Sequence, residues 1–189
     1  LGREKFSAYY ESFGFTGRTG IDLPGEARSS IYYQVEDMGP VELASSSFGQ
    51  TNKVTPIQMI TAYAAAVNGG YLVTPYVVDK IVDENGTVVK TVEPNVRRQV
   101  ISEETSAYMR TVLESVVNNN GGGNSYIQGY RIGGKSGTSE KQDENLAENR
   151  EDLYVSSYVG FAPADDPEII MLVMVDRPTG ADYYGSVVA

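Results

Sequence analysis

The stretch Gly129-Tyr-Arg-Ile-Gly-Gly-Lys-Ser-Gly-Thr138 decides between two folds for this chain. Four of its residues fit G-x-x-x-x-G-K-[ST], the pattern of a glycine-rich loop that binds nucleotide phosphates: Gly129, Gly134, Lys135 and Ser136. The same stretch also fits a β-strand, in which the residues from Lys135 onward alternate between the two faces of a sheet. The two interpretations imply different chemistry, so the flanking sequence has to separate them.

The flanks disfavour nucleotide binding. A phosphate-binding loop follows a buried strand and opens a helix, whose first N–H groups contact the phosphates. Residues 118–128 read Asn-Asn-Asn-Gly-Gly-Gly-Asn-Ser-Tyr-Ile-Gln, which is too polar and too rich in glycine for a buried strand. Gly137 weakens a helix start, and residues 138–145 have no apolar face. A P-loop nucleotide-binding module therefore stays a remote alternative.

The strand interpretation suits an acyl-transfer site. Gly133 and Gly134 would let another backbone come close, and Lys135 would point its ammonium into a cleft. Gly137 would leave room for a ligand along the main chain, and Thr138 would supply a hydroxyl and a backbone N–H. A cation and hydroxyls bind a carboxylate, while an N–H group binds the oxyanion of a tetrahedral intermediate. The simpler alternative is a solvated lysine that keeps an edge strand from pairing.

Composition excludes several kinds of chemistry. A chain of 189 residues with 41% hydrophobic residues suits one globular domain, and its net charge of −10 argues against a nucleic-acid partner. The chain has no Cys and no His, which rules out a Cys/His zinc site, a Cys nucleophile and a Ser-His-Asp triad. We therefore expect no metal and no cofactor. No stretch reaches the roughly 18 uncharged apolar residues that a membrane helix needs.

Helices are predicted in three places. Apolar spacing predicts a short helix over Lys5–Phe13. Thr55-Pro56-Ile57-Gln58 predicts a capping box that opens a second helix, which should end at Asn68-Gly69-Gly70. Ser102 should cap a third, whose predicted buried face is Tyr108, Met109, Val112, Leu113, Val116 and Val117.

Strands and loops fill the rest of the pattern. Asn85-Gly86 between Val77–Val82 and Thr87–Val92 predicts a hairpin. Tyr154–Ala162 and Ile169–Val175 predict two more strands, of which the second lacks alternation, as expected for a central strand covered on both faces. Residues 14–26 are predicted to be a structured surface loop, and residues 140–152 a solvated loop or a mobile excursion. The predicted fold class is α/β of the α+β type, an antiparallel sheet with flanking helices.

Four ordered blocks span nearly the whole chain. They are Phe13-Gly-Phe with Thr19-Gly-Ile-Asp-Leu-Pro-Gly-Glu26, Ser47-Phe-Gly-Gln50 with Val54–Gly70, Gly133-Gly-Lys-Ser-Gly-Thr138, and Ser157-Tyr-Val-Gly-Phe-Ala-Pro163. In content and order these blocks resemble the transpeptidase domain of the monofunctional (class B) penicillin-binding proteins, and Gly133–Thr138 matches the third motif of that family.

The resemblance implies a partial penicillin-binding-protein and serine β-lactamase-like fold, with β-lactams and a peptidoglycan stem peptide as ligands. Lys135 and Ser136 would help to hold the ligand carboxylate. Thr138 would give half of the oxyanion hole through its N–H and touch the carboxylate through its hydroxyl. Gly137, Ser139 and Glu140 would line the path of the peptide, which would add to the strand as a further β-strand.

The chain also departs from the family pattern. It contains no Ser-x-x-Lys, no Ser-x-Asn and no Tyr-x-Asn, so the nucleophile, its lysine base and the second motif are absent. We therefore expect residues 1–189 to be the C-terminal portion of the domain, without the final helix and inactive alone. The membrane anchor is expected in the missing N-terminal part, on the extracytoplasmic face of the cell membrane. A non-catalytic scaffold or sensor is the alternative, and the loop and helix blocks resemble transpeptidases more than β-lactamases.

Two further expectations concern the open sides of the sheet. Without a partner strand from the missing part, Ile169–Val175 would expose an apolar edge through which the piece self-associates. Glu140 would place an acid at the mouth of the cleft and repel anionic β-lactams.

Overall fold

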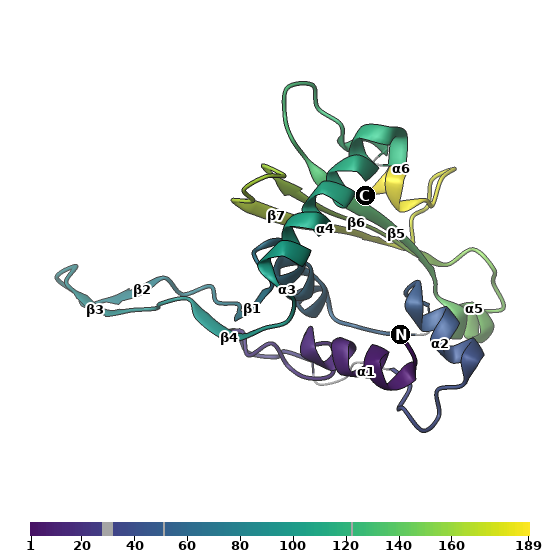
Figure 1. Ribbon diagram of the computed structural model, residues 1–189, viewed down its shortest axis with the longest axis horizontal. Helices are drawn as coiled ribbons and strands as arrows, with labels where there is room; N and C mark the ends of the chain where they lie inside the picture. Colours follow the sequence, from purple (N-terminus) through teal and green to yellow (C-terminus); the bar gives the residue numbers. More distant parts are fainter. Residues whose placement is uncertain (28–31, 51, 122) are drawn as a thin grey trace. The chain divides into compact units, whose positions relative to one another are not determined.

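The computed structural model describes residues 1–27, 32–50, 52–121 and 123–189, and the chain forms two compact units that divide between Glu103 and Glu104. Among its described residues, the first unit holds three helices and two small antiparallel sheets (Figure 1). The helices are α1 (Arg3–Ser12), α2 (Pro40–Ser47) and α3 (Pro56–Val67). Strand β1 (Tyr71–Thr74) pairs with β4 (Asn95–Gln99), and β2 (Lys80–Val82) pairs with β3 (Val88–Thr91).

The capping box predicted at the start of α3 is confirmed. The Gln58 N–H donates to Thr55 Oγ1 at 3.2 Å, and the Thr55 N–H donates to Gln58 Oε1 at 2.9 Å. Gln58 is buried, and its Nε2 also donates to the carbonyl oxygens of Phe15 and Gly17 at 3.2 and 2.8 Å. One side chain therefore caps the helix and holds the glycine-rich segment, which is the structured surface loop that its composition predicts.

The predicted hairpin is confirmed, with shorter strands than the apolar runs suggested. The Asp83 carboxylate accepts hydrogen bonds from the N–H groups of Asn85 and Thr87 and so shapes the turn. The first strand loses Val77 and Val78, because their N–H groups donate to the carboxylate of Asp22 at 2.8 and 2.9 Å. These two bonds also lower the pKa of Asp22.

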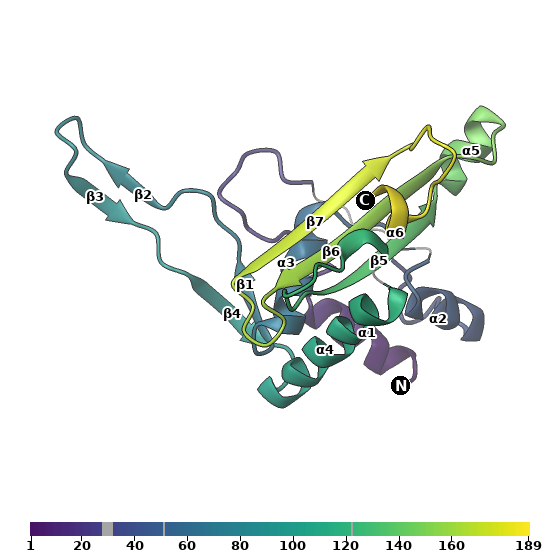
Figure 2. The same cartoon turned by 90° about the horizontal axis from the view of Figure 1, so that it is seen from above.

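The second unit is built on a three-stranded antiparallel sheet in the order β5–β6–β7 (Figure 2). The strands are β5 (Gly133–Glu140), β6 (Tyr154–Ala162) and β7 (Ile169–Asp176). Helix α4 (Glu103–Val116) precedes β5 in the chain, and the four-residue α6 (Gly185–Val188) packs against β5 and β6 (Figure 1). Two helical turns, η1 (Val117–Gly121) and η2 (Gly123–Ser125), flank residue 122, which lies outside the described residues.

Two predictions for this unit are wrong, and a third is only partly right. Strand β7 lies at the edge of the sheet, and its residues are exposed or half-buried, so it is not a central strand covered on both faces. The segment after Glu140 is not all loop, because it contains helix α5 (Gln142–Glu148).

The predicted buried face of α4 is confirmed in part: Leu113 and Val117 are buried, Met109 and Val116 are half-buried, and Tyr108 and Val112 are exposed. The face passes through Ser106, Leu113 and Val117, whereas Tyr108 is 69% exposed. At about 100° per residue, Tyr108 lies about 200° around the helix from Ser106, so it points away from the face that is buried. The small polar Ser106, which the predicted apolar face leaves out, is fully buried instead.

Candidate active site

Strand β5 offers an open edge along the whole predicted motif. The Lys141 N–H donates to the Leu153 carbonyl oxygen at 2.8 Å, in line with the β5–β6 register. Because backbone bonds in an antiparallel pair alternate along each strand, Lys135, Gly137 and Ser139 bond to β6. The N–H and C=O groups of the intervening residues, Ser136 and Thr138 among them, therefore face outward. Within the described residues no strand pairs with this edge, so a ligand backbone can pair along it.

The motif side chains alternate between the two faces of the sheet. Ser136 and Thr138 lie opposite Tyr158 and Ser156, and so share a face with them, whereas Lys135 lies on the other face. However, Lys135 Nζ donates to the carbonyl oxygen of Ser136 at 2.8 Å, and that carbonyl faces the open edge. This bond draws the ammonium toward the edge. Lys135 is exposed, and no ion pair involves it in the described part of the chain.

The glycine pair before Lys135 has a different role from the predicted one. A Cβ on Gly133 would overlap the ring of Phe161, and a Cβ on Gly134 would overlap the ring of Tyr158. Aromatic side chains of β6 therefore cover the two glycines, where close approach of another backbone was expected. A Cβ on Gly137 would lie 2.7 Å from Ser157 Oγ, so this glycine also makes room for a side chain of β6. In the sequence, the signal for this packing was two glycines in one predicted strand, Gly133 and Gly134, and two aromatic residues in the next, Tyr158 and Phe161.

The hydroxyl of Thr138 has a partner that sequence reasoning missed. The N–H of Gly185 donates to Thr138 Oγ1 at 3.0 Å. The next residue on the same face, Ser156, donates its hydroxyl to the carbonyl oxygen of Tyr183. Residues almost fifty positions apart meet here, and no local pattern in the sequence predicts such a contact.

A buried amide holds Glu140 at the end of the strand. Asn145 in α5 is 4% exposed, and its Nδ2 donates to Glu140 Oε1 at 3.2 Å. The Asn145 Oδ1 in turn accepts the Leu153 N–H at 3.0 Å. The predicted site residue Glu140 therefore has an exposed but fixed carboxylate, whereas Ser139 is exposed on the opposite face.

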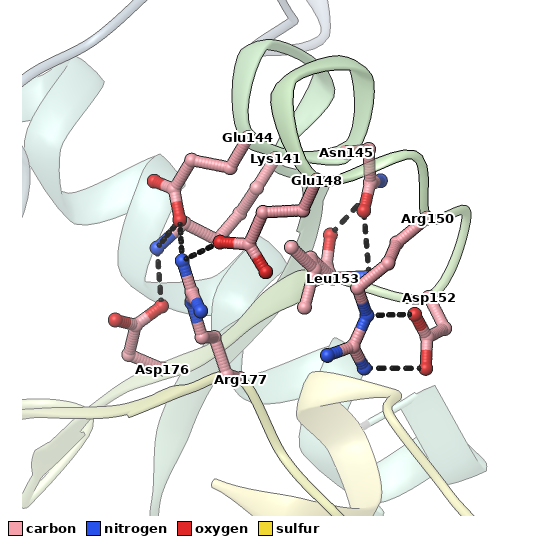
Figure 3. Close-up of polar contacts among 9 residues, drawn as sticks. All are labelled: Lys141, Glu144, Asn145, Glu148, Arg150, Asp152, Leu153, Asp176 and Arg177. Carbon is pink, nitrogen blue, oxygen red and sulfur yellow. Dashed lines mark hydrogen bonds and ion pairs between the residues drawn. The ribbon is translucent and has the colours of Figure 1, made fainter.

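An ion-pair cluster ties α5 to the ends of β5 and β7 (Figure 3). Lys141 Nζ lies 2.8 Å from Asp176 and 2.9 Å from Glu144. Arg177 lies 2.6 Å from Glu144 and 2.8 Å from Glu148. The hydrogen bonds from Lys141 and Arg177 lower the pKa of Glu144. This cluster explains why a segment without an apolar face is helical.

Because the pKa of Glu144 is lowered in the folded protein, its stabilising effect is complete above the unfolded value of about 4.3 and is lost as pH falls through the folded value. We expect Glu144→Gln to speed amide exchange in α5 at pH 7 and to have little effect in strong acid. Hydrogen exchange followed by mass spectrometry measures this, with the exposed Glu151→Gln as control. Equal exchange in wild type and E144Q at pH 7 would contradict the prediction.

The family model described as "Penicillin binding protein transpeptidase domain" matches residues 1–189. The chain belongs to this family. Within the transpeptidase family, it is 47% identical over 191 residues to stage V sporulation protein D of Bacillus subtilis, and this match covers 100% of the chain and 29% of that protein. It is 30% identical over 188 residues to penicillin-binding protein PbpB of Mycolicibacterium smegmatis, covering 96% of the chain and 29% of that protein.

Solved transpeptidase structures share the fold. Penicillin-binding protein 3 from Mycobacterium tuberculosis, complexed with aztreonam, superposes with a TM-score of 0.84 at 27% identity, over 95% of this chain and 41% of that one. The transpeptidase domain of Burkholderia pseudomallei penicillin-binding protein 3 gives a TM-score of 0.81 at 29% identity, over 98% of this chain and 53% of that one. The predicted family and fold class are therefore confirmed. The chain spans less than a third of the two curated relatives named above.

Proposed function

We propose that these 189 residues are the C-terminal portion of the transpeptidase domain of a peptidoglycan D,D-transpeptidase. Such an enzyme cross-links stem peptides through a serine acyl-enzyme and reacts with β-lactams. One observation carries the proposal: the Lys135 ammonium and the outward N–H of Thr138 meet at one open strand edge. A relative named probable peptidoglycan D,D-transpeptidase PenA from Neisseria gonorrhoeae, 30% identical over 191 residues, supports it.

The geometry suits an extended peptide that adds to β5. Its terminal carboxylate would bind Lys135 with the hydroxyls of Ser136 and Thr138, and its backbone would pair along the outward groups of the strand. A serine hydroxyl would attack the carbonyl carbon next to the leaving residue. The oxygen of that carbonyl becomes an oxyanion, which the Thr138 N–H would stabilise. The base takes the serine proton and passes it to the leaving nitrogen as the C–N bond breaks, so the amine leaves neutral and the serine keeps the acyl group.

The serine and its base must come from residues outside this sequence, because no Ser-x-x-Lys occurs in it. The small share of each relative that the chain covers supports the same view. We propose that the rest of the domain also supplies the strand that pairs with β7, and that the complete protein works on the extracytoplasmic face of the membrane. Among the described residues, none of the helices is long and apolar enough to span a bilayer.

Labelling with a fluorescent penicillin tests the proposal. We expect a covalent adduct on the complete protein and none on the 189-residue chain. A stable adduct on the 189-residue chain would contradict the account of the nucleophile, and a complete protein that takes no label would favour a scaffold or sensor. A titration with ATP and Mg²⁺ that gives heat would revive the nucleotide-binding alternative.

The exposed edge strand β7 should make the 189-residue chain self-associate. Ile169 and Met171 are 66% and 63% exposed, and within the described residues no strand pairs with the outer edge of β7. We expect sedimentation to show dimers or larger species, and Met171→Lys to shift them toward monomer. Val89→Lys on β3, which is 67% exposed, is the matched control. A monomer at high concentration in the unaltered chain would refute the idea.

Glu140 should slow acylation by anionic β-lactams. At about 10 Å in water a unit charge pair contributes about 0.4 kcal/mol, which is about a twofold change in rate. We expect Glu140→Gln in the complete protein to raise the acylation rate by about that factor at low salt, and less at high salt. Stopped-flow acylation measures it, with Glu168→Gln as control. Rates that do not respond to E140Q at low salt would rule out this effect.

A further inference from the structure

The C-terminal segment from Tyr183 to Gly185 lies over the paired strands β5 and β6, and there the Gly185 N–H donates to Thr138 Oγ1 at 3.0 Å. We propose that Gly185 is a positioning residue for acyl transfer, which orients the Thr138 hydroxyl toward the acyl donor. The inference rests on the proposed function, because it assigns a part of the same site.

The first argument is the hydrogen-bonding capacity of the hydroxyl. A threonine hydroxyl has one proton to donate and two acceptor positions. The Gly185 N–H occupies one acceptor position, and in the described part of the chain no acceptor takes the hydroxyl proton of Thr138. The bond therefore restricts rotation of the side chain and leaves the proton for an oxygen from outside, such as a carboxylate oxygen of the acyl donor.

The second argument is that the segment is anchored independently of Thr138. Ser156 is fully buried, lies opposite Thr138 in the sheet, and donates to the Tyr183 carbonyl oxygen. The ring of Tyr183 stacks on Tyr154 with a centroid distance of 4.2 Å and an angle of 14°. Tyr184 stacks on Tyr183 at 4.5 Å. The Gly185 N–H is thus held over the Thr138–Ser156 pair by contacts that do not need the Thr138 hydroxyl.

The third argument is that position 185 has no space for a side chain. A Cβ on Gly185 would overlap the carbonyl oxygens of Gly137 and Ser157, and it would lie 3.0 Å from the Ser157 nitrogen. These atoms belong to the backbone pairing of β5 with β6, so they cannot move aside without breaking the sheet. Any larger residue must therefore lift the segment, and with it the N–H group, away from Thr138.

A double-mutant cycle in the complete protein tests the inference. We expect Gly185→Ala to lower the second-order rate constant for acylation by a fluorescent penicillin roughly tenfold, the size expected for a hydrogen bond that acts on a charged group. Thr138→Val should do the same and Thr138→Ser should retain the rate. The double variant G185A/T138V should acylate no more slowly than T138V alone, because each change removes the same interaction. Val187→Ala, an exposed position in α6, is the control.

The outcomes separate positioning from a purely structural role. The inference is overturned if G185A acylates at the wild-type rate. It is also overturned if G185A slows acylation in the T138V background by the same factor as in the wild-type background. If G185A does not fold, Ser156→Ala replaces it, since this change releases only the Tyr183 carbonyl, and the same non-additivity is expected with T138V. A wild-type protein that takes no penicillin label overturns the proposed function as well. A labelled protein whose rate falls with Lys135→Ala but not with G185A overturns this inference alone.

Discussion

Replacing Lys135 with alanine in the complete protein should lower the rate of acylation by a fluorescent penicillin by about 100-fold or more. The ammonium is exposed, has no ion pair within the described residues, and is drawn to the open edge by its 2.8 Å bond to the Ser136 carbonyl oxygen. A cation in this place is available to bind the carboxylate of an incoming ligand. Loss of one donor at a preorganised acyl-transfer site costs about 10²–10³ in rate, which sets the expected size.

Lys90 on β3 is the matched control for that measurement. It is an exposed lysine on a two-stranded hairpin, so Lys90→Ala removes the same charge and should leave acylation unchanged. Thermal unfolding of both variants should be close to wild type, because neither side chain is buried. A K135A protein that acylates at the wild-type rate would support the simpler interpretation of Lys135 as a solvated edge lysine.

Phe161→Ala should destabilise the protein by about 3–5 kcal/mol, the range for removing a buried phenylalanine. Phe161 is 2% exposed, and its ring covers Gly133 on the neighbouring strand. Its removal would leave a cavity beside a residue that has no side chain to fill it. The sheet cannot close the gap by a shift of register, because one step would turn every side chain of the strand to the other face.

Urea denaturation of the complete protein measures this effect. Phe161→Leu keeps much of the apolar volume, so it should cost clearly less than Phe161→Ala. Acylation should also slow in Phe161→Ala, because Gly133 begins the strand that carries Lys135 and Thr138. A free energy of unfolding that changes by less than about 1 kcal/mol would show that the ring does not support the strand.

Elements with strong local signals were predictable from the sequence. The capping box at Thr55 and Gln58 and the Asn85-Gly86 hairpin both appear where their patterns put them. Strand β6 has the predicted bounds of Tyr154–Ala162. In each case a few neighbouring residues satisfy one another's hydrogen bonds, so the information is local.

Elements held by distant partners were mispredicted. Helix α5 depends on Arg177 and Asp176, which follow it by about thirty residues. The apolar run of β7 was interpreted as a central strand, but its second partner does not occur among the described residues. An apolar composition is the same whether or not other elements of the structure cover the strand, so composition alone could not show that β7 lies at an edge.

By itself, the sequence determined the family, the order of the elements and the identity of the Lys135–Thr138 strand, because these depend on residue types at short spacing. Only the tertiary structure decided which backbone groups of that strand face outward, which rings cover Gly133 and Gly134, and that Gly185 binds Thr138. The physical reason is that pairing register and contacts across a sheet join residues far apart in the chain. One residue of register reverses both the side-chain face and the direction of every backbone hydrogen bond.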